Sequence, residues 1–273
     1  GRPPSRAKSP RATAGARAET VTASPSSDLT LHLALFSHVA CRPESEIDLG
    51  QAALLIAEPE YEDLDVAVYL RTLDRLADQV RPRLGGSGEH AAKATALLGF
   101  LLQDEGFRGN TTEYEDPRNS FLNEVLERRL GIPISLAVLA MEVGRRCDIP
   151  LHGVSFPGHF LLRVDGGSYT AGRGEDPSSA VLFDPMTGRR LAGDDLQALL
   201  ARALGRRRTV TSDDLQVATK NAILIRMLTN LRNIYNRVGD GFRQQLAHER
   251  IRALQSAAQK PPPRPGRPPR VVH

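Results

Sequence analysis

The sequence of 273 residues contains no tryptophan, two cysteines and three methionines, and only 5% of its residues are aromatic. Two cysteines, Cys41 and Cys147, can form one disulfide at most, which excludes a disulfide framework. No cysteines or histidines have metal-ligand spacing, so we expect no metal site and no cofactor. No apolar stretch approaches the roughly 20 residues that cross a bilayer. The basic N-terminus also lacks the apolar segment of a secretory signal, so we expect a cytoplasmic protein without membrane contact.

The basic charge is concentrated at the two ends, although the pI of the whole sequence is ≈ 9.3. Residues 1–28 and 260–273 together hold nine basic and two acidic residues, a net charge of +7. The remaining residues hold 27 basic and 30 acidic side chains, a net charge of −3. The body therefore lacks the charge of a nucleic-acid groove, and we expect nucleic-acid binding only non-specifically through the tails.

Four segments follow from the composition. Residues 1–28 lack apolar periodicity and are predicted to be a disordered basic tail. Residues 258–273 contain PPPRPGRPP and are predicted to be a second disordered tail, of extended polyproline II type. Between them we predict one domain over residues 29–205 and a helical hairpin over residues 206–257.

Helical patterns dominate the first half of the domain, and short β-type patterns follow. Apolar residues at helical spacing predict helices, and β-branched or aromatic runs bounded by glycine and proline predict strands. The predicted helices cover residues 29–39, 47–57, 64–80, 90–103, 121–129, 135–146 and a hairpin within 213–257, and the predicted strands cover residues 151–156, 159–164 and 180–183. Helices followed by a small antiparallel sheet predict an α+β fold.

Three polar residues stand out in this pattern. Ser135 opens an apolar helix, His159 begins an apolar run, and Asp184 follows a short strand. A nucleophile at a helix start, then a histidine, then an acid is the chain order of a papain-like site. Each residue also has a structural explanation, since serine caps helix starts, a buried histidine is usually hydrogen-bonded, and aspartate before proline initiates turns.

Other polar residues near Ser135 complete the candidate site. Asn119, Asn123 and Glu124 are predicted to line the cleft, although capping by Asn119 or Ser120 and a solvated helix face explain them equally well. Cys147 is excluded as a nucleophile because it lies at a helix C-terminus, where the dipole disfavours a thiolate. The triplet Arg206-Arg207-Arg208 is predicted to be surface charge, since no glycine-rich loop supports a phosphate site.

The sequence resembles the SirB family of bacterial proteins, whose domain belongs to the transglutaminase-like superfamily and also occurs in some eukaryotic F-box proteins. Five segments carry the resemblance: IDLGQAALLIAEPEYEDLDV (47–66), NSFLNEVLERRLGIPISLAVLAMEV (119–143), GVSFPGHFLLRV (153–164), LFDPMTG (182–188) and RMLTNLRNIYNRVGD (226–240). The resemblance implies a papain-like core followed by a tetratricopeptide-like helical hairpin. It also implies that Ser135 occupies the nucleophile position, His159 the base and Asp184 the orienting acid.

Because serine replaces the superfamily's cysteine at position 135, two functional hypotheses follow. A cysteine is partly thiolate at neutral pH, whereas a serine hydroxyl needs a well-placed base in every cycle. The first hypothesis is therefore a non-catalytic regulatory module that binds a protein or peptide through the cleft or the hairpin. The alternative is a hydrolase or acyltransferase acting on amide or ester carbonyls through Ser135, His159 and Asp184.

Overall fold

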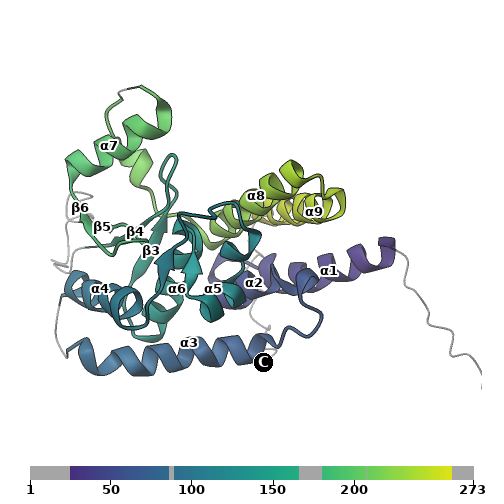
Figure 1. Ribbon diagram of the computed structural model, residues 1–273, viewed down its shortest axis with the longest axis horizontal. Coiled ribbons are helices and arrows are strands. Elements are labelled where there is room, and N and C mark those ends of the chain that lie inside the picture. Colours follow the sequence, from purple (N-terminus) through teal and green to yellow (C-terminus); the bar gives the residue numbers. More distant parts are fainter. Residues whose placement is uncertain (1–24, 86–88, 166–179, 207, 260–273) are drawn as a thin grey trace, which may run out of the picture.

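The computed structural model describes residues 25–85, 89–165, 180–206 and 208–259. Both predicted tails, apart from a few residues at their inner ends, and the glycine run 86–88 lie outside these ranges. The described chain combines many helices with two small sheets, which confirms the predicted α+β class (Figure 1).

Four α-helices open the described chain. They are α1 (Pro25–Ala40), α2 (Leu49–Leu55), α3 (Val66–Val80) and α4 (His90–Gly99). Helix α3 has the strongest amphipathic pattern and begins where Asp65 accepts hydrogen bonds from the N–H groups of Ala67 and Val68. A single π-helical turn, η4 (Phe100–Asp104), continues α4. The short 3-10 turns are η1 (Glu44–Glu46), η2 (Glu58–Glu60), η3 (Arg81–Arg83), η5 (Pro117–Asn119) and η7 (Ser212–Leu215).

Helix α6 (Pro133–Arg146) is the centre of the core. Every residue from Pro133 to Gly144 is buried, and the helix contacts α2, α3, α4, α8 and the sheet, together with α5 (Leu122–Arg128). A helix that is apolar on nearly all sides must lie inside the domain, as its sequence predicts. It begins two residues before the predicted start at Ser135, because proline suits the first helical turn.

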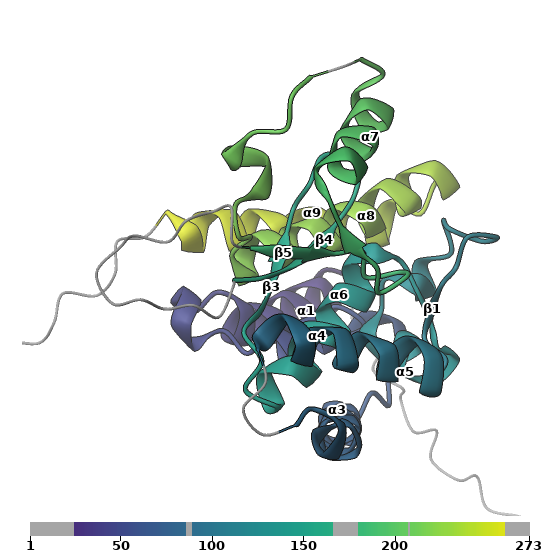
Figure 2. The same cartoon turned by 90° about the vertical axis from the view of Figure 1, so that its left-hand side faces the viewer.

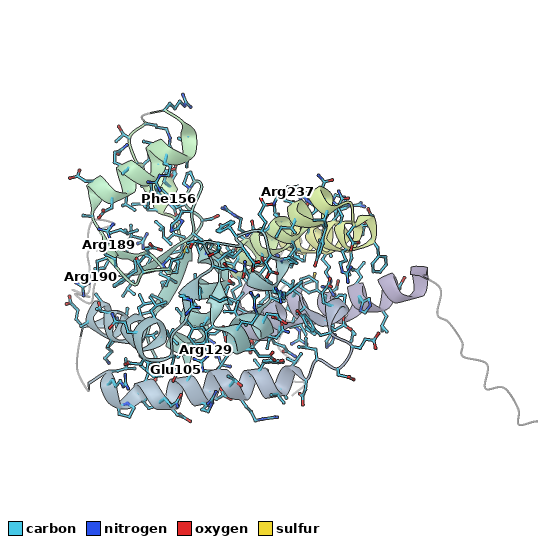
Figure 3. All side chains as sticks on the ribbon, in the orientation of Figure 1. Glu105, Arg129, Phe156, Arg189, Arg190 and Arg237 are labelled. Atoms are coloured by element: carbon cyan, nitrogen blue, oxygen red, sulfur yellow. The ribbon has the colours of Figure 1, made fainter. Side chains whose placement is uncertain are left out.

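Arg129 connects α5 to the start of α6. It ends α5 in the left-handed conformation, with φ 60°. Its guanidinium pairs with Glu105 at 2.5 Å (Figure 3). The same guanidinium lies over the ring of Phe107. The next two residues form β2 (Leu130–Gly131), which pairs in parallel with β1 (Arg108–Gly109). The two-residue strands were not predicted, and they fix the path of the chain into α6.

The main sheet is antiparallel, with the strand order β3-β4-β5-β6. Its strands are β3 (Leu151–Val154), β4 (Leu161–Val164), β5 (Val181–Phe183) and β6 (Arg190–Leu191). Figure 2 shows α7 (Gly193–Leu204) above the sheet and the helices α4 and α6 below it. The strand predicted over residues 159–164 is β4, which starts two residues later at Leu161 because Pro157–His159 form a turn.

The sheet separates two hydrophobic clusters. The larger one includes α6 and the helices around it. The smaller one, which we call the α7 cluster, joins the upper face of the sheet to α7 and contains Phe156 (Figure 3). Its six buried members are Val154, Phe156, Leu161, Leu182, Leu196 and Leu200.

Helices α8 (Lys220–Val238) and α9 (Gly241–Ala258) form an antiparallel hairpin with a left-handed Gly239 at the turn. The hairpin packs against α1 and α2 (Figure 1), and most of its buried apolar side chains belong to the larger cluster. Arg250 of α9 is almost fully buried and donates to the carbonyl oxygens of Ile56 and His32. The hairpin therefore shares its core with the helices that surround α6.

Candidate functional site

Ser135 lies in the first turn of α6 and is completely buried. Its hydroxyl accepts a hydrogen bond from the N–H of Ile132, at 3.0 Å. The same hydroxyl donates to the carbonyl oxygen of Asn119 at 2.6 Å, and the carbonyl of Ile132 lies at 3.1 Å. Because a hydroxyl carries one proton, the short contact to Asn119 uses it. The hydroxyl thus ties the start of α6 to the loop that precedes α5.

Asn119 has a structural role in the same network. Its amide nitrogen donates to the carbonyl of Glu113 at 2.7 Å, and its amide oxygen accepts from Asn110 at 3.1 Å. The capping prediction for α5 was wrong, since the N-cap is Phe121 and no side chain caps that helix. The polar atoms of Asn119 are used to close the loop before α5, so they are not available at the helix start.

Asn123 and Glu124, which were predicted to line the cleft, lie on α5. Glu124 accepts a hydrogen bond from the Tyr61 hydroxyl at 2.9 Å and lies 3.8 Å from Arg128. Burial and the neighbouring Glu124 carboxylate raise the pKa of Tyr61, so the phenol stays protonated. Asn123 is 2% exposed, and its side-chain oxygen has no partner among the described residues.

His159 and Asp184 do come together. His159 Nε2 lies 3.3 Å from Asp184 Oδ1. The pairing of β4 with β5 brings them close, since each residue lies just outside its strand. Asp184 also accepts from the N–H of Met186 at 2.9 Å and the hydroxyl of Thr187 at 3.0 Å. Burial alone raises the pKa of Asp184, but these hydrogen bonds outweigh it, and the net pKa is lowered.

A small cavity of ≈ 30 Å³ lies beside His159, and we call it the His159 cavity. The start of α6 contributes Ile132, Pro133 and Ile134 to its wall, and α8 contributes two polar side chains. The full lining is Tyr114, Ile132, Pro133, Ile134, Gly158, His159, Phe160, Arg226 and Asn230. Ser135 and the three residues predicted to line the cleft are not part of it.

The structure joins two of the three predicted site residues directly. His159 and Asp184 are hydrogen-bonded, whereas no hydrogen bond joins Ser135 to either of them within the part of the chain that the structure describes. The helix-start residues that share the cavity with His159 are Ile132, Pro133 and Ile134, and none of them carries a nucleophile.

Arg226 and Asn230 were missed by the sequence reasoning. They are one helical turn apart on α8, so they share a face, and this i, i+4 spacing of polar residues in an apolar helix was the available signal. They lie far from His159 in the sequence, so no local pattern predicted that they share a cavity with it. A larger groove of ≈ 690 Å³ lies elsewhere, between the outer edge of β3, the C-terminal half of α6 and the start of α8.

The remaining predicted features are placed as follows. Cys147 is buried at the end of α6, and burial raises the pKa of its thiol. Arg208 forms a two-fold ion pair with Asp214, consistent with surface charge. Over the described ranges, no His, Cys, Asp and Glu side chains are grouped to hold a metal ion. None of the helices seen there is long and apolar enough to cross a membrane.

Comparisons with known proteins identify this arrangement. The family model described as Transglutaminase-like superfamily matches residues 67–229, from α3 into α8. The chain therefore belongs to the transglutaminase-like superfamily.

Two bacterial relatives narrow this assignment. The chain is 39% identical to a UPF0162 protein of Xylella fastidiosa over 213 residues, which are 75% of this chain and 71% of the relative. It is 37% identical to a UPF0162 protein of Pseudomonas aeruginosa over 200 residues, 73% of this chain and 69% of the relative. The chain is thus also a member of the UPF0162 family.

A eukaryotic relative covers a shorter stretch. F-box only protein 21 of Homo sapiens is 30% identical over 156 residues, which are 56% of this chain and 24% of that protein. No solved structure matches the chain significantly.

Proposed function

We propose that this protein is a non-catalytic transglutaminase-like domain of the SirB type, which regulates a process by binding a protein or peptide. One observation carries the proposal: the Ser135 hydroxyl is bonded to backbone groups, while Pro133 and Ile134 line the same cavity as His159. A domain that has the histidine and its acid but lacks a nucleophile beside them can still bind a partner in the cleft. It cannot form a covalent intermediate.

The physical argument concerns the serine proton. An attacking serine must pass its proton to a base within hydrogen-bond reach, which is about 2.6–3.2 Å. Ser135 instead donates to the carbonyl of Asn119. Turning the hydroxyl toward His159 would leave a buried carbonyl and a buried N–H without partners, at a cost of about 1–3 kcal/mol each.

A second candidate is a hydrolase or acyltransferase that uses Ser135, His159 and Asp184. The observation that favours it is the His159–Asp184 hydrogen bond, which orients an imidazole as in a catalytic triad. It requires a movement of α6 or of the loop before α5 that brings the Ser135 hydroxyl into the His159 cavity.

The hairpin of α8 and α9 is the second element of the proposal. We propose that it is tetratricopeptide-like and offers a surface to a protein partner. Support comes from its two antiparallel helices and from the exposed apolar side chains of Val238 and Phe242 at its turn.

Active-site labelling separates the two candidates. Wild type, Ser135→Ala and Ser120→Ala are treated with a fluorophosphonate, and labelling is read by mass spectrometry. We expect no labelled serine in any of them. Labelling of Ser135 in wild type and in the Ser120→Ala control would show a working nucleophile and reject the proposal.

A designed thiol tests the same geometry from the other side. Pro133→Cys, in a background with Cys41→Ser and Cys147→Ser, places sulfur on the wall shared with His159. We expect a fast reaction with iodoacetamide, slowed when His159→Asn is added, because a facing imidazole and a helix N-terminus lower a thiol pKa. The same reaction rate with and without His159 would show that Pro133 does not face it.

A further inference from the structure

We propose that the His159 cavity binds a carboxylate group through Arg226, Asn230, His159 and the first turn of α6. This inference rests on the proposed function, because it assigns to the non-catalytic cleft the chemistry of the group that it holds. The argument has four parts: charge, backbone donors, the histidine and size.

Arg226 supplies the charge. It is half-buried, and its one hydrogen bond is a long contact of 3.4 Å from Nη1 to the hydroxyl of Ser155. It has no acidic partner among the described residues, whereas comparable arginines such as Arg208 and Arg243 form close ion pairs. A guanidinium fork without a carboxylate, set in a cavity wall, matches the geometry of a carboxylate.

The first turn of α6 supplies backbone donors. Its N-cap is Ile132, whose side chain cannot accept a hydrogen bond, and Pro133 has no N–H. The N–H groups of Ile134 and Ser135 have no acceptor within the described ranges, although both residues are buried. The first N–H groups of a helix have no partner within that helix, and they lie at the positive end of its dipole. Ile134 itself lines the cavity.

His159 adds an N–H donor that a carboxylate can accept from. The ionised Asp184 lies against Nε2, and three donors satisfy this carboxylate: His159, the Met186 N–H and the Thr187 hydroxyl. The other ring nitrogen, Nδ1, has no hydrogen bond to any described residue. When the imidazole is protonated, Nδ1 donates, and a second carboxylate then has a partner.

The size of the cavity limits the ligand. A cavity needs roughly 10–15 Å³ to hold one water, so ≈ 30 Å³ suits a small polar group. A flat carboxylate with two oxygens suits this space better than the bulkier phosphate or sulfate. The carboxylate can belong to a small acid or to the C-terminus of a peptide, and binding experiments distinguish these sources.

The test uses the full chain and three probes in nuclear magnetic resonance titrations at constant ionic strength. The probes are acetate, a short peptide with a free C-terminal carboxylate, and the same peptide amidated. We expect acetate and the free peptide to shift the backbone amide of Ile134 and the imidazole of His159. We expect the amidated peptide to shift neither. Tighter binding of the free peptide than of acetate identifies a peptide terminus as the source, and equal binding identifies a small acid.

Arg226→Gln should weaken binding by about 10-fold or more, because hydrogen bonds to a charged group contribute about 1.5–3 kcal/mol. Arg232→Gln is the matched control, since it removes the same charge from the same helix outside the cavity wall. Equal weakening by both variants, or equal shifts by chloride, would overturn the carboxylate site. If Arg226→Gln unfolds the protein, Arg226→Lys and Asn230→Ala give the same comparison.

The outcomes of this test and of the labelling experiment are independent. Labelled Ser135 rejects the non-catalytic function whatever acetate does. Absence of labelling together with absence of acetate shifts leaves the non-catalytic function in place and rejects only the carboxylate site.

Discussion

Two buried serines in one segment provide a sharp test of the role of Ser135. Ser135 and Ser120 are both completely buried. The hydroxyl of Ser135 joins Ile132 and Asn119, whereas the hydroxyl of Ser120 has no partner among the described residues. Replacing each by alanine removes the same atom from similar surroundings. The difference between the two variants therefore measures the hydrogen bonds of Ser135.

The magnitude follows from the groups left behind. Ser135→Ala leaves the N–H of Ile132 and the carbonyl of Asn119 buried without partners, each at about 1–3 kcal/mol. Alanine regains roughly 0.5 kcal/mol of helix propensity, so the free energy of unfolding should fall by about 1.5–5.5 kcal/mol. Ser120→Ala removes a hydroxyl that is already unpaired, so it should stay within about 1 kcal/mol of wild type.

Urea unfolding followed by circular dichroism measures both values, provided that the m-value is unchanged. For a protein of this size, 1 kcal/mol corresponds to roughly 2–4 °C in Tm. The reasoning is refuted if Ser135→Ala costs less than about 1 kcal/mol, or if Ser120→Ala costs as much. Either result would mean that the hydroxyl of Ser135 is free to serve another purpose.

Three further predictions concern the surroundings of the site. Gly158→Ala should destabilise the fold by about 2 kcal/mol or more in the urea assay. The reasons are that φ is +69° and that the new methyl would lie 2.5 Å from a methyl of α7. Gly193→Ala is the control and should be neutral, because open space surrounds this glycine. Because folding lowers the pKa of Asp184, its ionised carboxylate stabilises the fold at pH values above the unfolded pKa. This stability is lost as the pH falls through the folded pKa. The cost of Asp184→Asn, measured as the urea midpoint, should therefore shrink between pH 7 and about pH 3; a constant cost would contradict this. Burial raises the pKa of the Cys147 thiol, so Cys147 should be alkylated at least about 100-fold more slowly in native than in urea-unfolded protein. Mass spectrometry measures both rates, and similar rates would contradict this prediction.

The fold was predictable where local patterns are strong. The 3.6-residue period predicted a helix over residues 64–80, and α3 runs from Val66 to Val80. The short β-branched runs predicted the strands β3 and β5 within two residues. The two-residue strands β1 and β2 carry no such pattern, because their pairing depends on Arg129 and its contacts with distant residues.

The candidate site was less predictable, since it depends on which way side chains point. The sequence placed Ser135 at a helix start, and the structure agrees on the helix. The direction of its hydroxyl depends on the Asn119 carbonyl, sixteen residues away, which no local pattern encodes. Arg226 reaches the cavity from a helix that follows the whole sheet in sequence. Order along the chain therefore predicted the His159–Asp184 pair but not the cavity beside it.

The two hydrophobic clusters on opposite faces of the sheet differ greatly in the number of buried apolar residues. Full burial of a large apolar side chain contributes about 1.5–3 kcal/mol, so six such residues hold α7 far less firmly than the larger cluster holds α6. Segments with few buried contacts open at lower free energy than the global unfolding of the domain. Gly158, in the wall of the His159 cavity, lies close to Ala203 of α7. A local opening of α7 would therefore widen the cavity while the central helix stays folded.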